Sequence, residues 1–149
     1  MNSPTIEVTT VAHSIQLSVA PVFLLSGIGV FLGVLTSRLA RVVDRARPLE
    51  DQLRDAHGVE ARDLRERLTW LAQRGRLIHL AITLSTVAAL LVAIVVALLF
   101  ASNFVQFSLA VPVATLFIGS MLSLVGALLA FLIEVQIATR TIRIGPPAK

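Results

Sequence analysis

The sequence contains no cysteine and few charged residues. Without cysteine, the chain has no disulfide framework, no thiolate nucleophile and no thiolate metal site. Only 15% of its residues are charged and 56% are hydrophobic, whereas an ordinary soluble domain has roughly 25% charged and 45–50% apolar residues. The 149 residues therefore predict one small membrane domain.

Catalytic motifs are lacking as well. The chain has no Gly-rich phosphate loop, no HExxH and no nucleophile–base pair, so we expect no enzyme, no catalytic residue and no cofactor. The histidines His13, His57 and His79 fall in layers too far apart to form one metal site within a subunit, and no metal is expected. The N-terminus has no basic n-region and no small-residue cleavage site, so we expect no removed signal peptide.

Three long apolar runs predict an all-α membrane protein with three transmembrane helices. A charged segment between the first two runs predicts a cytoplasmic helical hairpin. A helix can begin at about Thr10, after an extended or frayed start, and Pro21 favours a kink inside the first span. The expected parts are span 1 (15–36), the hairpin (37–76), span 2 (77–101), span 3 (107–133) and a cytoplasmic tail (134–149).

Apolar residues in the hairpin recur at spacings of three and four, which is the a/d seam of an antiparallel coiled coil. The turn is expected at Gly58, since glycine tolerates a positive φ. The seam positions are Leu39, Val42, Ala46, Leu49, Leu53 and Ala56 before the turn, and Ala61, Leu64, Leu68, Leu71, Gly75 and Ile78 after it. The ion pairs expected across the turn are Glu50 with Arg65 or Arg67, and Arg54 with Glu60 or Asp63.

All 13 Lys and Arg residues lie either in the hairpin or after span 3. The positive-inside rule therefore predicts an outer N-terminus, with the hairpin and the C-terminus in the cytoplasm. Because the basic residues are placed beside apolar spans, membrane orientation explains the formal charge of +4 better than nucleic-acid binding does.

The first span has an Ala-Pro pair near its start and is followed by the stretch RLARVVDRAR. This pattern resembles a family of small three-span bacterial inner-membrane proteins known only as a domain of unknown function. The resemblance covers nearly the whole chain and implies a multi-pass protein of the bacterial inner (plasma) membrane, without implying an activity. The matching residues are Ala20, Pro21, Arg38, Leu39, Ala40, Arg41, Asp44, Arg45 and Arg47.

The basic stretch after span 1 is the densest candidate site. Arg38, Arg41 and Arg45 follow one another at i, i+3 and i+7 on one helix face. With Arg47 they are candidates to bind anionic lipid head groups or a soluble anion. The alternative is an orientation anchor with internal ion pairs, in which Asp44 pairs with Arg41 or Arg47.

Glu134 ends span 3 and joins Asp44 as an ion-pair or gate candidate. An acid at the edge of the hydrocarbon either pairs with a base from another helix or handles protons or cations. The expected partners are Arg38, Arg76 or Arg140.

Small residues predict two helix-contact faces. One has Gly29 and Gly33 on span 1, and the other has Ser120, Ser123, Ala127 and Ala130 on span 3. Since one thin bundle cannot bury so many faces, we expect a homo-oligomer. The expected function is a structural or interaction protein whose hairpin binds anionic lipid or a cytoplasmic protein partner. The alternative is a small oligomeric ion channel or transporter lined by span 1, with its inner mouth at Arg38, Arg41 and Asp44.

Overall fold

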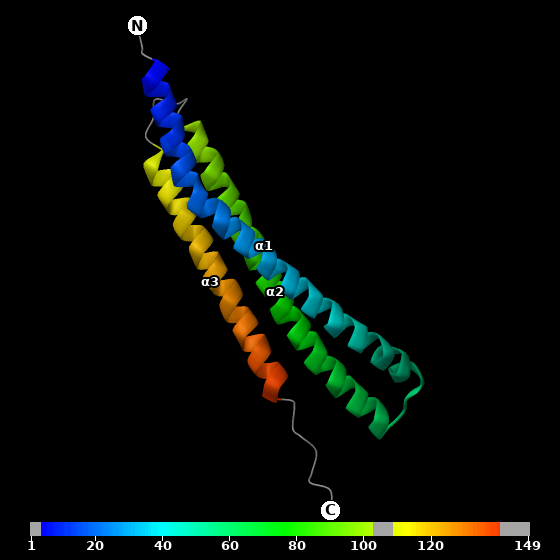
Figure 1. The fold of residues 1–149 in the computed structure, drawn as a ribbon. Helices are drawn as coiled ribbons and strands as arrows, with labels where there is room; N and C mark the ends of the chain where they lie inside the picture. Colours follow the sequence, from blue (N-terminus) through cyan, green and yellow to red (C-terminus); the bar gives the residue numbers. More distant parts are fainter. Residues whose placement is uncertain (1–3, 103–108, 141–149) are drawn as a thin grey trace, which may run out of the picture. The chain divides into compact units, whose positions relative to one another are not determined.

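The computed structural model is all-helical, as the sequence predicts, over its described residues. These are residues 4–102 and 109–140, with side chains described except at 4–15, 17, 18 and 140. The helices in Figure 1 are α1 (Pro4–Asp55), α2 (Val59–Ala101) and α3 (Ala110–Arg140). All three contain a stretch long and apolar enough to cross a membrane.

Helix α1 starts earlier than the sequence predicted. It begins at Pro4 and not near Thr10, because proline suits the first turn of a helix, where its missing N–H would have no intrahelical acceptor. Of the expected extended or frayed start, the extended alternative was therefore wrong from Pro4 onward, and residues 1–3 lie outside the described residues. The helix then continues through Pro21 to Asp55, so the segment before Pro21 belongs to the same helix as the segment after it.

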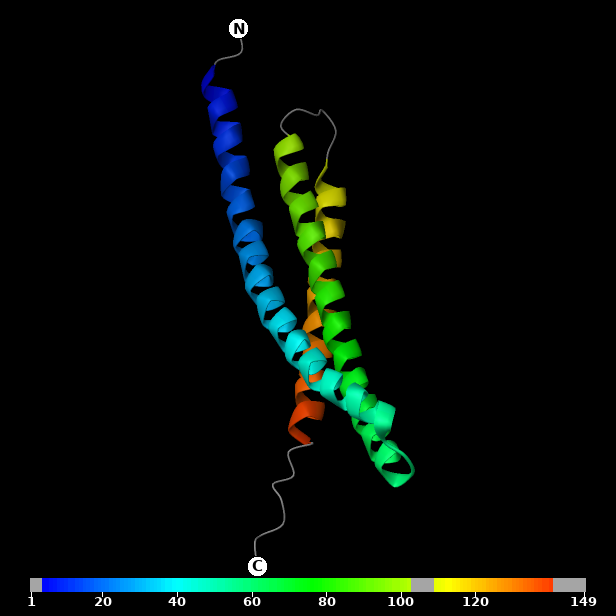
Figure 2. The same ribbon diagram turned by 90° about the vertical axis from the view of Figure 1, so that its right-hand side faces the viewer.

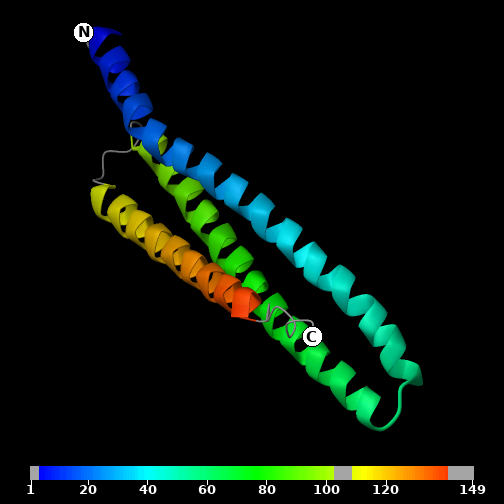
Figure 3. The same ribbon diagram turned by 60° about the horizontal axis from the view of Figure 1, so that its bottom comes forward.

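A short link joins α1 to α2 where the sequence predicted a turn (Figure 3). The N–H of Ala56 still donates to the carbonyl oxygen of Gln52 at 3.1 Å, which closes the end of α1. Gly58 has a φ of +65°, a left-handed conformation that carries no Cβ penalty in glycine. The predicted turn at Gly58 is confirmed.

The chain forms two compact units, of which the first comprises residues 1–33 and 84–125. Its buried core consists of Ile28 from α1 and Ala88 and Val92 from α2. Helix α3 also contacts α2 in this unit. The hydroxyl of Ser123 on α3 donates a hydrogen bond to the carbonyl oxygen of Leu84 on α2 at 2.8 Å. Figure 2 shows these parts of α2 and α3 side by side. Partly buried side chains packed on the core are Leu24, Leu25, Leu32, Ala89 and Leu124.

The second unit comprises residues 34–83 and 126–149. Three helices contribute to its interior, and one of the buried side chains is an acid, Glu134. The other buried residues are Leu35 and Val42 from α1, Ala61, Leu64, Ile78 and Ala81 from α2, and Ala127 and Ala130 from α3.

Residues 37–76, which all belong to this second unit, are called the arm below. All 12 predicted seam positions in the arm and at its end are buried or half-buried, whereas every other residue between Ala40 and Gln73 is exposed. Burial in the arm therefore follows the three-and-four spacing of its apolar residues.

The ion pairs of the arm differ from those predicted across the turn. Arg54 pairs with Asp51, and Arg67 pairs with Asp63 at 2.9 Å, each within one helix. No ion pair joins Glu50 to Arg65 or Arg67 in the described part of the chain. The expected pairs across the turn were wrong, and for Arg54 and Arg67 the reason is that an acid three or four residues away on the same helix is already within reach.

Several predictions fall outside the described residues. They concern most of the expected link at 102–106, the start of span 3 at 107, the side chains of His13 and Arg140, the tail cations Arg143 and Lys149, and the helix stop at 145–147.

Candidate functional site

Glu134 lies on the small-residue face of α3. Its position continues the spacing of Ser120, Ser123, Ala127 and Ala130, so the acid and the small residues belong to one stripe of the helix. Small side chains allow neighbouring helices to approach closely. Within the second unit, Ala127 and Ala130 are buried, and Glu134 one turn further on is 0% exposed.

Two arginines from two other helices bind the Glu134 carboxylate. Arg38 of α1 donates through Nη1 to Oε2 at 2.5 Å. Arg74 of α2 donates to Oε1 through Nε at 3.1 Å and through Nη2 at 2.7 Å. The guanidinium carbon of Arg38 also lies 5.0 Å from the centre of the Phe131 ring, within the range of a cation–π contact. One buried acid therefore links all three helices.

Of the partners expected for Glu134, Arg38 forms the predicted ion pair and Arg76 does not. Arg74 lies four residues before Ile78 and seven before Ala81, both fully buried, so it continues the inward face of α2. Arg76 is two residues further along, which turns it by about 200° around the helix. It is exposed and lines a separate pocket that also contains His79.

A pocket of about 120 Å³ opens beside this ion cluster. Four of the five residues that line it are arginines: Arg38, Arg41, Arg45 and Arg74, together with Val42. The structure therefore brings together three of the four predicted anion-binding arginines and adds Arg74.

Arg47 and Asp44 do not line this pocket. Both are exposed, and around the helix they point well away from the face shared by Arg38, Arg41 and Arg45. Among the described residues, Asp44 forms no ion pair with Arg41 or Arg47, so the expected internal pairing was wrong. The role of Asp44 as a gate stays a prediction.

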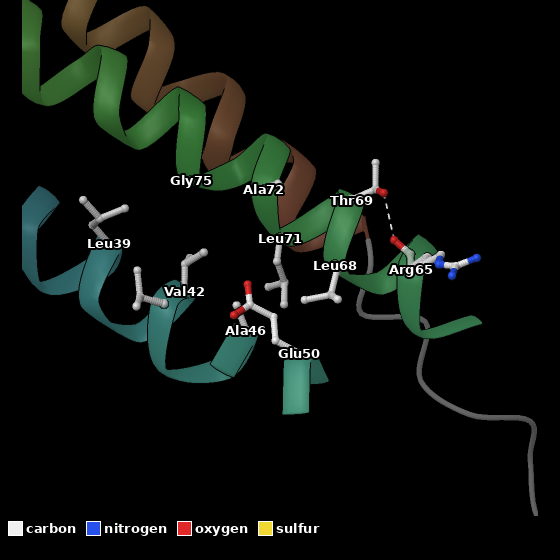
Figure 4. Close-up of a pocket in the computed structure, with 11 residues that line it drawn as sticks. Leu39, Val42, Ala46, Glu50, Arg65, Leu68, Thr69, Leu71, Ala72 and Gly75 are labelled. Carbon is white, nitrogen blue, oxygen red and sulfur yellow. Dashed lines mark hydrogen bonds between the residues drawn. The ribbon is translucent and has the colours of Figure 1, made fainter. Parts of the chain in front are cut away.

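A larger groove of about 580 Å³ lies between the two helices of the arm. Figure 4 shows Leu39 and Val42 from α1 and Leu71 from α2 around it. The groove has two charged lining residues, Glu50 and Arg65, and the rest are mostly apolar. In the described residues, no group of three His, Cys, Asp or Glu side chains is placed to hold a metal ion.

Comparison with known protein families identifies the family of the chain. Residues 18–144 match the family described as protein of unknown function, DUF2721. The chain belongs to the DUF2721 family. The predicted resemblance to a family of unknown function is thereby confirmed, and the match includes the ion cluster and the arginine pocket. No curated protein and no solved structure matches the chain.

Three helices that are long and apolar enough to span a bilayer make this DUF2721 chain a multi-pass membrane protein. Its two predicted packing faces differ in the structure. Ser120, Ala127 and Ala130 are buried. A Cβ added at Gly29 or Gly33 would meet no atom within 4 Å, so these two glycines do not mediate a close helix approach within one chain.

Proposed function

We propose that this protein is a non-enzymatic, homo-oligomeric interaction protein of the bacterial inner membrane. In this proposal the N-terminus lies outside, and the arm and the C-terminus lie in the cytoplasm. The distribution of charge supports this orientation, since ten of the 13 Lys and Arg residues lie in the arm and none lies in 1–37 or 77–139. This asymmetry is what the positive-inside rule requires.

The arm is proposed to form an antiparallel coiled coil that contacts other protein chains. Burial along its seam supports the coiled coil. Three large apolar side chains remain exposed on it, Val43 at 42%, Val59 at 85% and Trp70 at 51%, and exposed apolar groups in water favour association. The proposed partner that covers these exposed side chains is a second copy of the chain, and a cytoplasmic protein is the alternative partner.

The open face of α1 is the observation that carries the homo-oligomer. Gly27, Gly29 and Gly33 are exposed there, and an added Cβ at any of them would meet nothing within 4 Å. Helices associate in membranes through such small residues because their backbones can come close together. The corresponding small face of α3 is already used within the chain, whereas that of α1 is available to another copy.

Native mass spectrometry of the detergent-extracted protein tests this proposal. We expect an oligomer, and we expect Gly29→Ile to weaken its association by a factor of about 5 to 150, because overpacking a helix contact costs roughly 1–3 kcal/mol. Ala93→Ile is the matched control, since Ala93 is an exposed small residue on α2. A monomeric wild type, or an oligomer unchanged by Gly29→Ile, would contradict the proposed interface.

The channel alternative requires a continuous polar or small face on α1. Phe23 is 74% exposed and Val30 is 72% exposed, and both lie on the same open face as the glycines. Large apolar side chains there favour contact with lipid or protein over a conducting path. A ring of about four or more subunits with an axial opening, together with ion flux in liposomes, would replace our proposal by the channel.

A further inference from the structure

The arginine pocket has more positive charge than the protein neutralises. Arg38, Arg41, Arg45 and Arg74 line it, and Glu134 is the one carboxylate that forms an ion pair with any of them in the described part of the chain. Four guanidinium groups against one carboxylate give the pocket an excess of three positive charges, and Arg41 and Arg45 have no acidic partner in the described part of the chain. Arg38 and Arg74 are half-buried, Arg41 and Arg45 are exposed, and like charges gathered around one pocket repel each other unless an anion joins them.

The hydrogen-bond donors of the pocket are also incompletely used. A guanidinium group has five N–H donors. Arg38 directs Nη1 at Glu134, and Arg74 directs Nε and Nη2 at it. Among the described residues, Nε and Nη2 of Arg38 and Nη1 of Arg74 have no acceptor, and neither do the donors of Arg41 and Arg45.

The size and position of the pocket limit which acceptor fits there. Its volume is about 120 Å³, well below the roughly 300–1,000 Å³ of pockets that hold drug-sized ligands, so a group of a few atoms such as one tetrahedral oxyanion suits it. Arg38 lies two residues after the apolar span of α1, and Arg74 lies three residues before that of α2, which starts at Leu77. Arginines at such positions lie at the level of lipid head groups.

We infer that this pocket binds one phosphate group, whose oxygens accept hydrogen bonds from Arg38, Arg41, Arg45 and Arg74. Guanidinium groups favour phosphate because their paired N–H groups match its oxygens. The phosphate comes either from the head group of an anionic phospholipid or from a soluble phosphate. The inference does not depend on the oligomer proposed above, because all four arginines belong to one chain.

The test uses two double variants that remove the same charge. Arg41→Gln/Arg45→Gln alters the pocket without touching the ion cluster at Glu134, so the fold is retained. Arg47→Gln/Arg76→Gln is the control, because both of these arginines are exposed and neither lines the pocket. Retention of phosphatidylglycerol against phosphatidylcholine is measured by native mass spectrometry, and binding of inorganic phosphate by thermal shift, both at roughly 0.3 M salt to screen diffuse attraction.

We expect phosphatidylglycerol to be retained over phosphatidylcholine. The pocket variant should weaken retention about 100-fold, or about tenfold for each lost charged hydrogen bond, whereas the control should change it clearly less, by at most about 30-fold before screening and by a smaller factor at this salt concentration. Binding of inorganic phosphate without phosphatidylglycerol would assign the site to a soluble phosphate. An equal loss in both variants, or no binding of either probe, would overturn the inference.

Discussion

Replacing Glu134 by Gln should destabilise the protein more than any exposed charge substitution. The carboxylate is 0% exposed and accepts hydrogen bonds from Arg38 and Arg74, whose side chains are 34% and 22% exposed. Removing one partner of a buried ion pair costs roughly 3–5 kcal/mol. Because both arginines can regain some hydration, we expect the lower end of this range, about 3 kcal/mol for Glu134→Gln.

The assay is reversible unfolding by sodium dodecyl sulfate in mixed micelles. Fluorescence of Trp70, the single tryptophan, reports the transition, since it lies one turn before Arg74 on α2. The matched control is Asp63→Asn, which breaks the exposed ion pair with Arg67. The side chain of Arg67 is 63% exposed and that of Asp63 is 58% exposed. That pair should contribute only about 0.3–0.5 kcal/mol.

A triple variant separates charge from packing. Arg38→Leu/Arg74→Leu/Glu134→Leu leaves no charge buried, and replacing a complete buried ion cluster by apolar residues is often neutral or stabilising. We therefore expect it to recover most of the stability that Glu134→Gln loses. The reasoning is refuted if Glu134→Gln changes the free energy of unfolding by less than about 1 kcal/mol, or by no more than Asp63→Asn does.

Two further substitutions have definite expectations. Gly58→Ala should lower the free energy of unfolding by about 1 kcal/mol, because alanine at a φ of +65° is strained; an unchanged midpoint in the same detergent titration would show that the turn can change its conformation. Ser123→Ala removes the hydrogen bond to the carbonyl oxygen of Leu84 and should cost about 0.6 kcal/mol, and a loss above about 2 kcal/mol would mean that Ser123 does more than bridge α2 and α3.

Periodicity was sufficient to predict which residues of the arm are buried. Residues such as Val42, Ala61 and Leu64 were found because a helix has only one face toward its neighbour, and apolar spacing marks that face. The turn was predictable for a similar reason, since Gly58 suits a left-handed backbone at no steric cost. Pro4 was also a usable signal for the start of α1, because proline suits the first turn of a helix, whereas the predicted start was at about Thr10.

Arg74 could have been found from the sequence. The buried stripe of α2 recurs at spacings of three and four, and extending it back by one step from Ile78 gives Arg74 and not Arg76. The expected partners of Glu134 were Arg38, Arg76 and Arg140, and Arg74 was not among them. The buried stripe of α2 consists of Ile78, Ala81, Ser85, Ala88, Val92 and Val95.

The composition of the pocket could not be predicted from spacing alone. Whether α2 meets the face of α1 that has Arg41 and Arg45, or the opposite face that has Arg47, depends on how each helix is rotated about its axis. Packing of three helices sets that rotation, which no single helix encodes. The same applies to the small residues: both stripes were recognised, but only packing decides which one, Ser120 or Gly29, is covered within the chain.

The three residues of the ion cluster are synthesised in a fixed order. Glu134 lies 96 residues after Arg38 and 60 residues after Arg74, and synthesis proceeds from the N-terminus. Arg38 and Arg74 are therefore synthesised before Glu134. Until Glu134 is made, each arginine can stay at the membrane surface, where arginine is well tolerated. When the last helix is inserted, its acid enters an interior that already contains its partners, so the growing protein need not hold an unpaired buried carboxylate.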